Sequence, residues 1–125
     1  WVNEDGSYTV LPGYYFYKQV SRAGQPGMAV VRATSRQTVT PVIAFGKDDT
    51  NNPNAFVLVN NSDTWTKEIQ VNIKGTSAKK FIAYRTTMGE DGDRYKEIGT
   101  FEVTDGYINT TLPVSSVTTF FEVKE

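Results

Sequence analysis

The sequence contains no cysteine and no histidine. Their absence excludes Ser-His-Asp and Cys-His nucleophile systems, zinc or iron sites built on thiolate or imidazole ligands, and disulfide bridges. Any chemistry in this chain must use carboxylates, lysine, tyrosine or hydroxyl groups. We therefore expect no cofactor.

An excess of one charge and long apolar runs are also missing. The chain has 13 basic and 14 acidic residues, a net charge of -1, and no basic stripe, which argues against a nucleic-acid partner because phosphates require clustered Lys and Arg. The strongly apolar runs are about five residues long, too short for a signal peptide or a membrane span. With 125 residues, the chain is expected to form one soluble domain without a membrane partner.

Leucine is scarce: there are 3 Leu against 16 Thr and 14 Val. Branched β-carbons suit a pleated sheet better than a helix, so the chain should consist mostly of strands. Apolar runs and period-two segments bounded by turn residues predict about eight of them. They lie at 28–34, 39–45, 56–59, 67–74, 81–86, 95–103, 107–112 and 117–123. This pattern predicts an all-β fold, an antiparallel β-sandwich.

The first 27 residues have a different pattern. Turn residues 4–7 predict a short hairpin within 1–11, and spacings of three and four residues predict a short helix over 14–20. Gly24 and Pro26 should end this helix. Seven helical residues are unstable alone in water, so the helix must pack on another element. We divide the chain into residues 1–27, the hairpin and helix, and residues 28–125, the β-sandwich.

Three segments resemble glycoside hydrolase family 30. VNEDGSYTVLPGYYFYKQVSRAGQPG at 2–27 resembles the junction where the last helix leaves the catalytic (β/α)8 barrel and enters a side β-sandwich. AFVLVNNSDTWTKEIQVNI at 55–73 resembles two paired strands of that sandwich, and LPVSSVTTFFEV at 112–123 its final strand. The resemblance implies that the chain is the C-terminal side β-sandwich of such an enzyme.

The resemblance also implies what the chain does not contain. The family's acid/base Glu and nucleophile Glu lie on barrel strands, and no residue of this sequence matches those positions. The implied protein is therefore a non-catalytic part of a secreted or cell-surface bacterial hydrolase, with the barrel of the parent chain as one partner. The aromatic cluster at 14–17 and Trp1 are then either the surface that contacts the barrel or an exposed binding stripe.

Clustered carboxylates occur in two turns, at Asp48 and Asp49 and at 90–93. A retaining glycosidase needs two carboxyls about 5 Å apart in a cleft, but both turns lack apolar neighbours that would raise a pKa, so we assign no catalytic residue. Asp48, Asp49, Asn51 and Asn52 also offer oxygen ligands for Ca²⁺. Their spacing matches no EF-hand, and we expect no bound metal.

Sugar binding is the remaining site chemistry, because an aromatic ring stacks on a pyranose face while polar side chains bind its hydroxyl groups. The candidate residues are Trp65 with Asn61 and Asp63, Tyr95 with Arg94, and Tyr107. Trp65 shares the odd-numbered parity of Ile69, Val71 and Ile73, which favours a place at the end of the core over an exposed platform.

Three functions fit these observations. The first is an accessory β-sandwich that supports a catalytic barrel and contacts a polysaccharide or oligosaccharide. The second is an independent carbohydrate-binding module. The third is an immunoglobulin-like spacer or protein-binding domain, although the buried Cys-Trp-Cys arrangement is absent.

Overall fold

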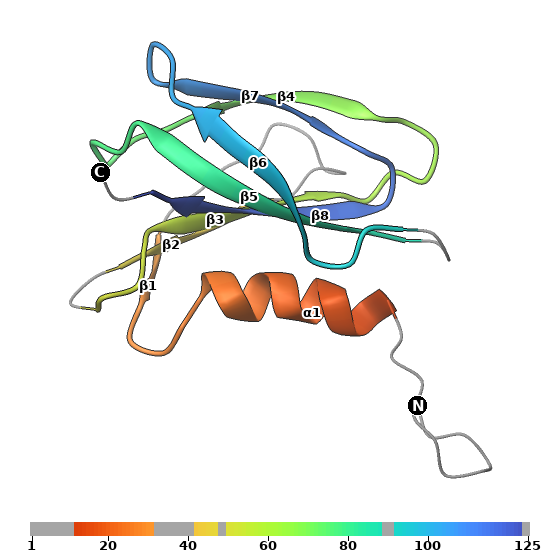
Figure 1. The fold of residues 1–125 in the computed structure, drawn as a ribbon, viewed down its shortest axis with the longest axis horizontal. Helices are drawn as coiled ribbons and strands as arrows, with labels where there is room; N and C mark the ends of the chain where they lie inside the picture. The colour runs from red at the N-terminus through yellow and green to blue at the C-terminus, as the bar shows by residue number, and fades with distance from the viewer. Residues whose placement is uncertain (1–11, 32–41, 48–49, 89–91, 124–125) are drawn as a thin grey trace, which may run out of the picture.

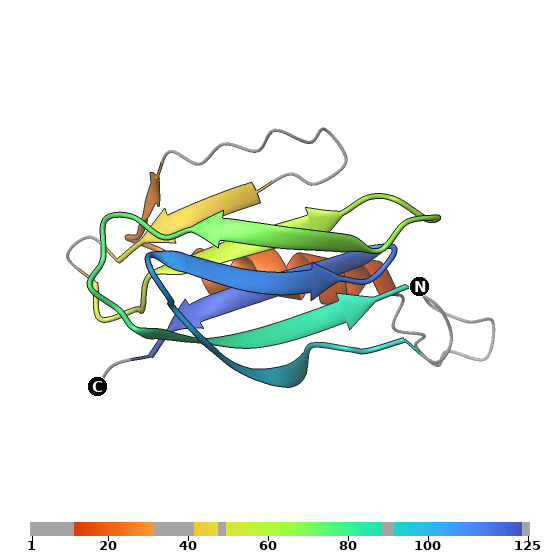
Figure 2. The ribbon, with the colours of Figure 1, turned by 90° about the horizontal axis from the view of Figure 1, so that it is seen from above.

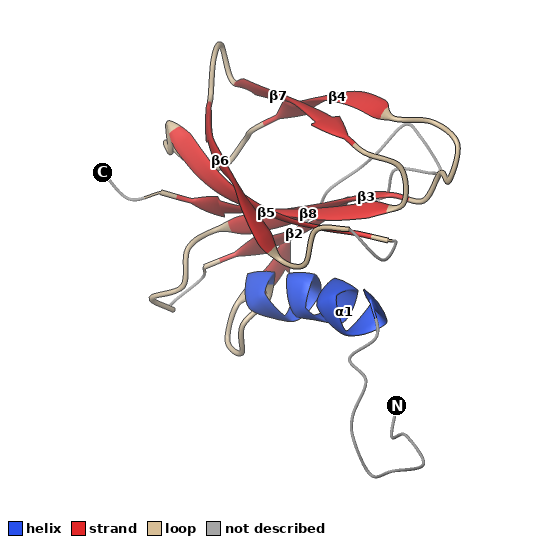
Figure 3. Ribbon diagram, turned by 45° about the vertical axis from the view of Figure 1, so that its right-hand side comes forward, coloured by secondary structure: helices blue, strands red, loops and turns tan. Residues whose placement is uncertain are grey.

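The structure, a computed structural model, consists of one helix and two antiparallel sheets stacked in three layers (Figure 1). It describes residues 12–31, 42–47, 50–88 and 92–123, and only the backbone of residues 12–17 and 31. The predicted hairpin at 1–11 and the side chains of the aromatic cluster at 14–17 lie outside this part of the chain. The larger sheet lies in the middle, with the smaller sheet on one face and the helix on the other (Figure 3).

The order of elements confirms the predicted β-sandwich with a helix before the strands. The larger sheet has the strand order β1-β2-β3-β8-β5-β6, and the smaller sheet pairs β4 with β7. Viewed from above, β4 and β7 cover only part of the larger sheet, and helix α1 runs beneath both (Figure 2). The elements are α1 (Pro12–Ala23), β1 (Ala29–Val31), β2 (Val42–Gly46), β3 (Ala55–Asn60), β4 (Lys67–Asn72), β5 (Lys80–Thr87), β6 (Lys96–Glu102), β7 (Tyr107–Leu112) and β8 (Ser116–Glu122).

Helix α1 is longer than the predicted seven residues because both ends carry stabilising groups. Pro12 occupies the first helical position, where its fixed φ suits a helix and its missing N–H costs no hydrogen bond. At the other end, the Gln25 side chain donates to the carbonyl oxygens of Ser21 and Arg22, at 3.1 and 3.0 Å. Gly24 follows the helix, as predicted.

The inner face of the larger sheet, which contacts the smaller sheet, is lined by buried aromatic and aliphatic side chains. Phe56 of β3 stacks on Phe120 of β8, with ring centroids 4.7 Å apart and an interplanar angle of 10°. Ile108 and Leu112 of β7 cover this face from the smaller sheet. Strand β4 alternates between half-buried and exposed residues, as its period-two pattern predicted.

The outer face of the larger sheet packs on α1. Here the buried residues are smaller: Ala55 and Val57 of β3 and Val117 of β8 meet Ala23 of the helix. Strand β3 is therefore covered on both faces, which confirms the prediction from its continuous apolar run. No helix in the described residues is long and apolar enough to cross a membrane.

Candidate functional site

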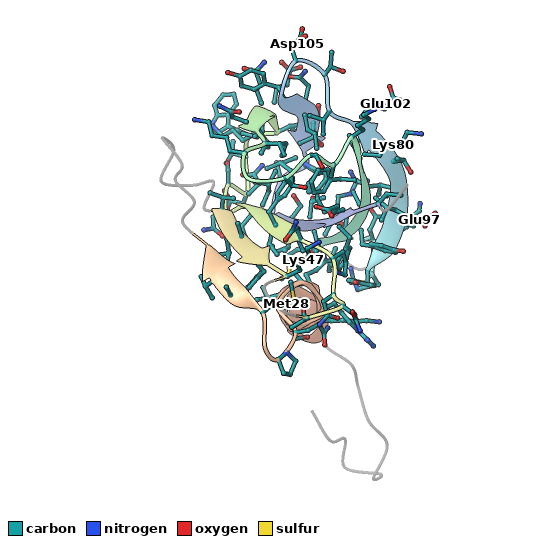
Figure 4. The ribbon with its side chains drawn as sticks, turned by 90° about the vertical axis from the view of Figure 1, so that its left-hand side faces the viewer. Met28, Lys47, Lys80, Glu97, Glu102 and Asp105 are labelled. Atoms are coloured by element: carbon teal, nitrogen blue, oxygen red, sulfur yellow. The ribbon has the colours of Figure 1, made fainter. Side chains whose placement is uncertain are left out.

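The two ends of the sandwich present different side chains. One end carries the β3–β4, β5–β6 and β7–β8 connections, and the exposed apolar side chains of Trp65, Met88 and Val114 lie there. The opposite end, seen in Figure 4, carries exposed charged residues such as Lys47, Lys80, Glu102 and Asp105.

Backbone hydrogen bonds connect the loops at the apolar end. The N–H of Ser115 donates to the carbonyl oxygen of Ser62 at 2.8 Å, and the N–H of Met88 donates to the carbonyl oxygen of Ser115 at 3.0 Å. The three loops therefore form one hydrogen-bonded unit, although their residues are far apart in the sequence.

Asn60, the last residue of β3, fixes two of these loops from beneath. Its side chain is buried, and its amide nitrogen donates to the carbonyl oxygens of Trp65, Leu112 and Pro113, at 3.0, 3.1 and 3.0 Å. Its amide oxygen accepts the N–H of Ser62 at 3.0 Å. One side chain thus forms hydrogen bonds with backbone groups of both the β3–β4 and β7–β8 connections. Buried polar side chains nearly always have such hydrogen-bond partners.

Trp65 has a fixed backbone and an exposed ring. Its N–H donates to the hydroxyl of Ser62 at 2.9 Å, and its carbonyl accepts from Asn60, yet the residue is 67% exposed. The predicted place at the end of the core is therefore wrong. Strand β4 begins only at Lys67, so its period-two alternation does not extend back to Trp65.

Asn61 and Asp63, the predicted polar partners of Trp65, are exposed on the same loop. The carboxylate of Asp63 accepts a hydrogen bond from the Thr64 hydroxyl at 3.0 Å. The structure thus brings an aromatic ring, an amide, a carboxylate and a hydroxyl together on one short loop. This group can stack on an apolar ring face and exchange hydrogen bonds around its edge.

Tyr95 lies beside the helix, and other residues already contact its ring. The ring stacks on Tyr84 with centroids 4.9 Å apart, and the ammonium of Lys18 lies 4.6 Å from the Tyr95 ring centroid. Tyr95 and Tyr84 line a pocket of about 420 Å³ together with Lys18 and Arg22 of α1. Burial, and next the neighbouring Tyr84, raise the pKa of Tyr95, while Arg22 opposes the shift. Burial of the ring therefore disfavours the charged phenolate.

The other predicted sugar-binding residues are not on the Trp65 loop. Arg94 donates from Nη1 to the carbonyl oxygens of Thr87 and Asp93, at 2.6 and 3.0 Å, so its guanidinium holds the β5–β6 connection. Tyr107 begins β7 at the charged end and is half-buried. The structure places the predicted residues at three sites, and only the Trp65 group is exposed as a unit.

Asp93, the described carboxylate of the acidic turns, has structural contacts. Asp93 Oδ2 accepts from Arg85 Nε at 3.0 Å and lies 3.0 Å from Arg85 Nη2, while Lys96 Nζ lies 3.8 Å from the other oxygen of Asp93. Asp48, Asp49, Glu90 and Asp91 lie outside the described residues. Within the described ranges, no group of three acidic side chains is arranged to hold a metal ion.

Sequence reasoning missed the side chain that fixes the helix to the sheet. Gln19 is fully buried in the outer interface, and its amide nitrogen donates to Thr119 Oγ1 at 2.6 Å and to the Tyr84 carbonyl at 3.1 Å. Its amide oxygen accepts from Thr86 Oγ1 at 3.0 Å, and its backbone carbonyl accepts from Thr119 Oγ1 at 3.0 Å. The only sequence signal was a lone polar residue on a helix face that also carries Val20 and Ala23.

The Gln19 network extends to the β5–β6 hairpin. Thr86 Oγ1, which donates to Gln19, also accepts the backbone N–H of Tyr95 at 2.9 Å. Tyr95 has a φ of 50°, a left-handed conformation that is uncommon for a bulky residue. Helix α1, strands β5 and β8 and the β5–β6 hairpin are thus connected through directional hydrogen bonds.

We compared the chain with known protein families, curated proteins and solved structures. No family model matches the chain, and no curated protein matches it. Among solved structures, a family 30 endoxylanase from Clostridium papyrosolvens C71 has a TM-score of 0.77 at 21% identity over 93% of this chain and 28% of that chain. A glycoside hydrolase family 30 subfamily 8 xylanase from Clostridium acetobutylicum has a TM-score of 0.77 at 24% identity over 95% of this chain and 29% of that chain.

A family 44 enzyme shows a weaker likeness. A xyloglucanase from Paenibacillus polymyxa has a TM-score of 0.66 at 13% identity over 76% of this chain and 19% of that chain. The chain therefore spans less than a third of the length of the enzymes it resembles. Its fold resembles the accessory β-sandwich domains of glycoside hydrolases of families 30 and 44, which confirms the fold that the sequence resemblance implied.

Proposed function

We propose that the chain is the non-catalytic accessory β-sandwich of a secreted bacterial glycoside hydrolase that degrades polysaccharides, and that it supports the catalytic (β/α)8 barrel of the parent chain. The proposal rests on the share of each chain that the structural match covers. Nearly the whole chain, 95%, corresponds to 29% of a family 30 xylanase, so the corresponding part is a minor portion of that enzyme.

The Gln19 network supports a buttressing role. A helix that enters the sandwich and is fixed by directional hydrogen bonds has one orientation relative to the sheet. Any domain that continues directly from this helix then inherits a defined orientation, instead of moving freely on a linker. Ser21 of α1 is exposed and available to such a neighbour.

The contacts of two described carboxylates, Asp93 and Glu122, also agree with a non-catalytic role. Asp93 is paired with Arg85, and Glu122 Oε2 accepts hydrogen bonds from Asn54 and Thr76, both at 2.7 Å. Carboxylates held by such structural contacts are poorly suited to give or take a proton from a glycosidic oxygen.

A hydrolysis assay tests this proposal. The purified 125-residue chain is incubated with xylan, β-glucan and galactan, and released reducing sugar is measured. We expect no release above the level of a heat-denatured sample. Release that disappears in Asp93→Asn or Glu122→Gln would assign hydrolysis to this chain and overturn the proposal.

An independent carbohydrate-binding module is a second candidate, favoured by the exposed ring of Trp65. The coding sequence upstream of Trp1 distinguishes the two. A (β/α)8 pattern of alternating strands and helices supports the accessory role, whereas a linker rich in Ser, Pro or Gly supports the independent module.

A further inference from the structure

The β3–β4 loop and the adjoining β7–β8 loop present a surface that the accessory role does not use. We call it the Trp65 surface and define it by its exposed residues: Asn61, Asp63, Thr64, Trp65, Thr66 and Val114. We propose that this surface binds a β-linked polysaccharide chain, with one pyranose ring stacked on the indole of Trp65. The proposal rests on the accessory function above and assigns it a carbohydrate site.

The first argument is that Trp65 is exposed on a loop that cannot easily move to bury it. Both backbone polar groups of Trp65 are hydrogen-bonded, to Ser62 and to Asn60. Ser62 is itself fixed, because its N–H donates to Asn60 and its carbonyl accepts from Ser115. A loop whose backbone is already fixed loses little conformational freedom when a ligand binds, which favours affinity.

The second argument concerns which ligand fits. The exposed residues next to Trp65 on the same loop carry an amide, a carboxylate and two hydroxyls, from Asn61, Asp63, Thr64 and Thr66. These groups accept or donate hydrogen bonds to sugar hydroxyls at the edge of a ring, while the indole covers its C–H face. A protein partner instead requires a larger surface with a desolvated apolar centre, typically about 800 Å² on each side.

The third argument concerns the kind of sugar. A flat indole can stack on either face of a pyranose whose ring hydroxyls are all equatorial, whereas an axial hydroxyl projects from one face and leaves only the other face for stacking. Glucose and xylose in β-linkage meet this condition, whereas galactose and mannose each carry one axial hydroxyl. We therefore expect cellulose and xylan to bind more tightly than galactan and mannan.

The structure also separates this surface from the other aromatic candidates. The Tyr95 ring already contacts Tyr84 and Lys18, and Tyr107 lies at the opposite end of the sandwich. If sugar binds at the Trp65 surface, substitution of Tyr107 should leave binding unchanged. Tyr107→Ala is therefore a matched aromatic control.

The test is a depletion binding assay of the full chain on insoluble cellulose and insoluble xylan. We expect saturable binding that falls at least about tenfold in association constant in Trp65→Ala, and that is largely kept in Trp65→Tyr. Val30→Ala removes another exposed apolar side chain, 75% exposed on β1, and should bind like the unsubstituted chain. Because Trp65 is exposed, the thermal unfolding midpoint of both Trp65 variants should stay unchanged, so a loss of binding in Trp65→Ala is not a loss of folding.

Three outcomes would overturn the proposal. In the first two, the chain binds neither cellulose nor xylan, or Trp65→Ala binds as tightly as the unsubstituted chain. In the third outcome, sedimentation velocity shows that the unsubstituted chain is a dimer and that Trp65→Ala is a monomer. This result would assign the Trp65 surface to contact with a second copy of the chain. Failure of binding leaves the accessory role intact, since that role is tested separately by the hydrolysis assay.

Discussion

The two faces of the six-stranded sheet are held to their neighbours by different forces. The inner face meets the smaller sheet through aromatic rings, such as the Phe56–Phe120 stack and the edge contact of Phe101 with Phe120 at 5.3 Å. The outer face meets the helix through small buried aliphatic side chains, with partly buried rings such as Phe121 beside them, and through the hydrogen bonds of Gln19 with Thr86 and Thr119.

This difference matters because the two kinds of contact fix different properties. Apolar burial is roughly proportional to area and has little directional preference, so the inner face supplies stability. Hydrogen bonds weaken steeply when their geometry changes, so the outer face sets the rotation and position of α1. The sandwich is therefore stabilised mainly on one face and oriented relative to its helix on the other.

The largest expected effect is on the inner face. Phe120→Ala removes a fully buried ring from the centre of the sheet and should lower the free energy of unfolding by about 3–5 kcal/mol, measured by urea denaturation. Phe121→Ala is the matched control, because Phe121 follows on the same strand, faces the helix and is only half-buried. An equal loss in both variants would contradict the assignment of stability mainly to the inner face.

The second prediction concerns the outer face. Gln19→Met keeps an unbranched side chain but removes every hydrogen bond of the amide, and should cost about 1–3 kcal/mol in the free energy of unfolding. The more specific readout is amide hydrogen exchange, which should accelerate in α1 more than in β3 and β8. A helix of 12 residues is marginal without its packing partner, so loosened docking exposes its amides.

Ser21→Ala is the control for Gln19→Met, since Ser21 lies on the same helix and is exposed. It should leave exchange in α1 unchanged. If Gln19→Met gives the same exchange pattern as Ser21→Ala, the network does not hold the helix in place.

Much of the fold could be predicted because strand signals are local. The alternation of Lys67 to Asn72 and the apolar run of Phe56 to Val59 each specify how their strand is buried, without knowledge of its neighbours. The sequence predicted a sandwich of two packed sheets, but not which strand belongs to which sheet. The order β1-β2-β3-β8-β5-β6 depends on contacts between residues far apart in the chain, which period-two patterns do not contain.

The site was less predictable, for two physical reasons. Parity arguments fail where a strand ends, so Trp65 was placed in the core although it precedes β4. Buried polar residues are also invisible to hydrophobic patterns: Asn60 and Gln19 resemble surface residues in the sequence. Their roles depend on carbonyl and hydroxyl groups of Leu112, Thr86 and Thr119, which are between 52 and 100 positions away.

The smallest expected effect compares two neighbouring hydroxyls on β8, one on each face. Thr118 faces inward between Leu58 and Arg85, and its Oγ1 is buried with no hydrogen-bond partner among the described residues. Thr118→Val keeps the shape and removes the cost of burying that hydroxyl, so the free energy of unfolding should rise by about 1 kcal/mol. Thr119→Val, on the outer face, removes the hydroxyl that bonds Gln19 and should lower the free energy of unfolding by about 1–2 kcal/mol. Urea denaturation of the two variants should therefore give shifts of opposite sign, because the Thr119 hydroxyl bonds the helix whereas the Thr118 hydroxyl has no partner among the described residues.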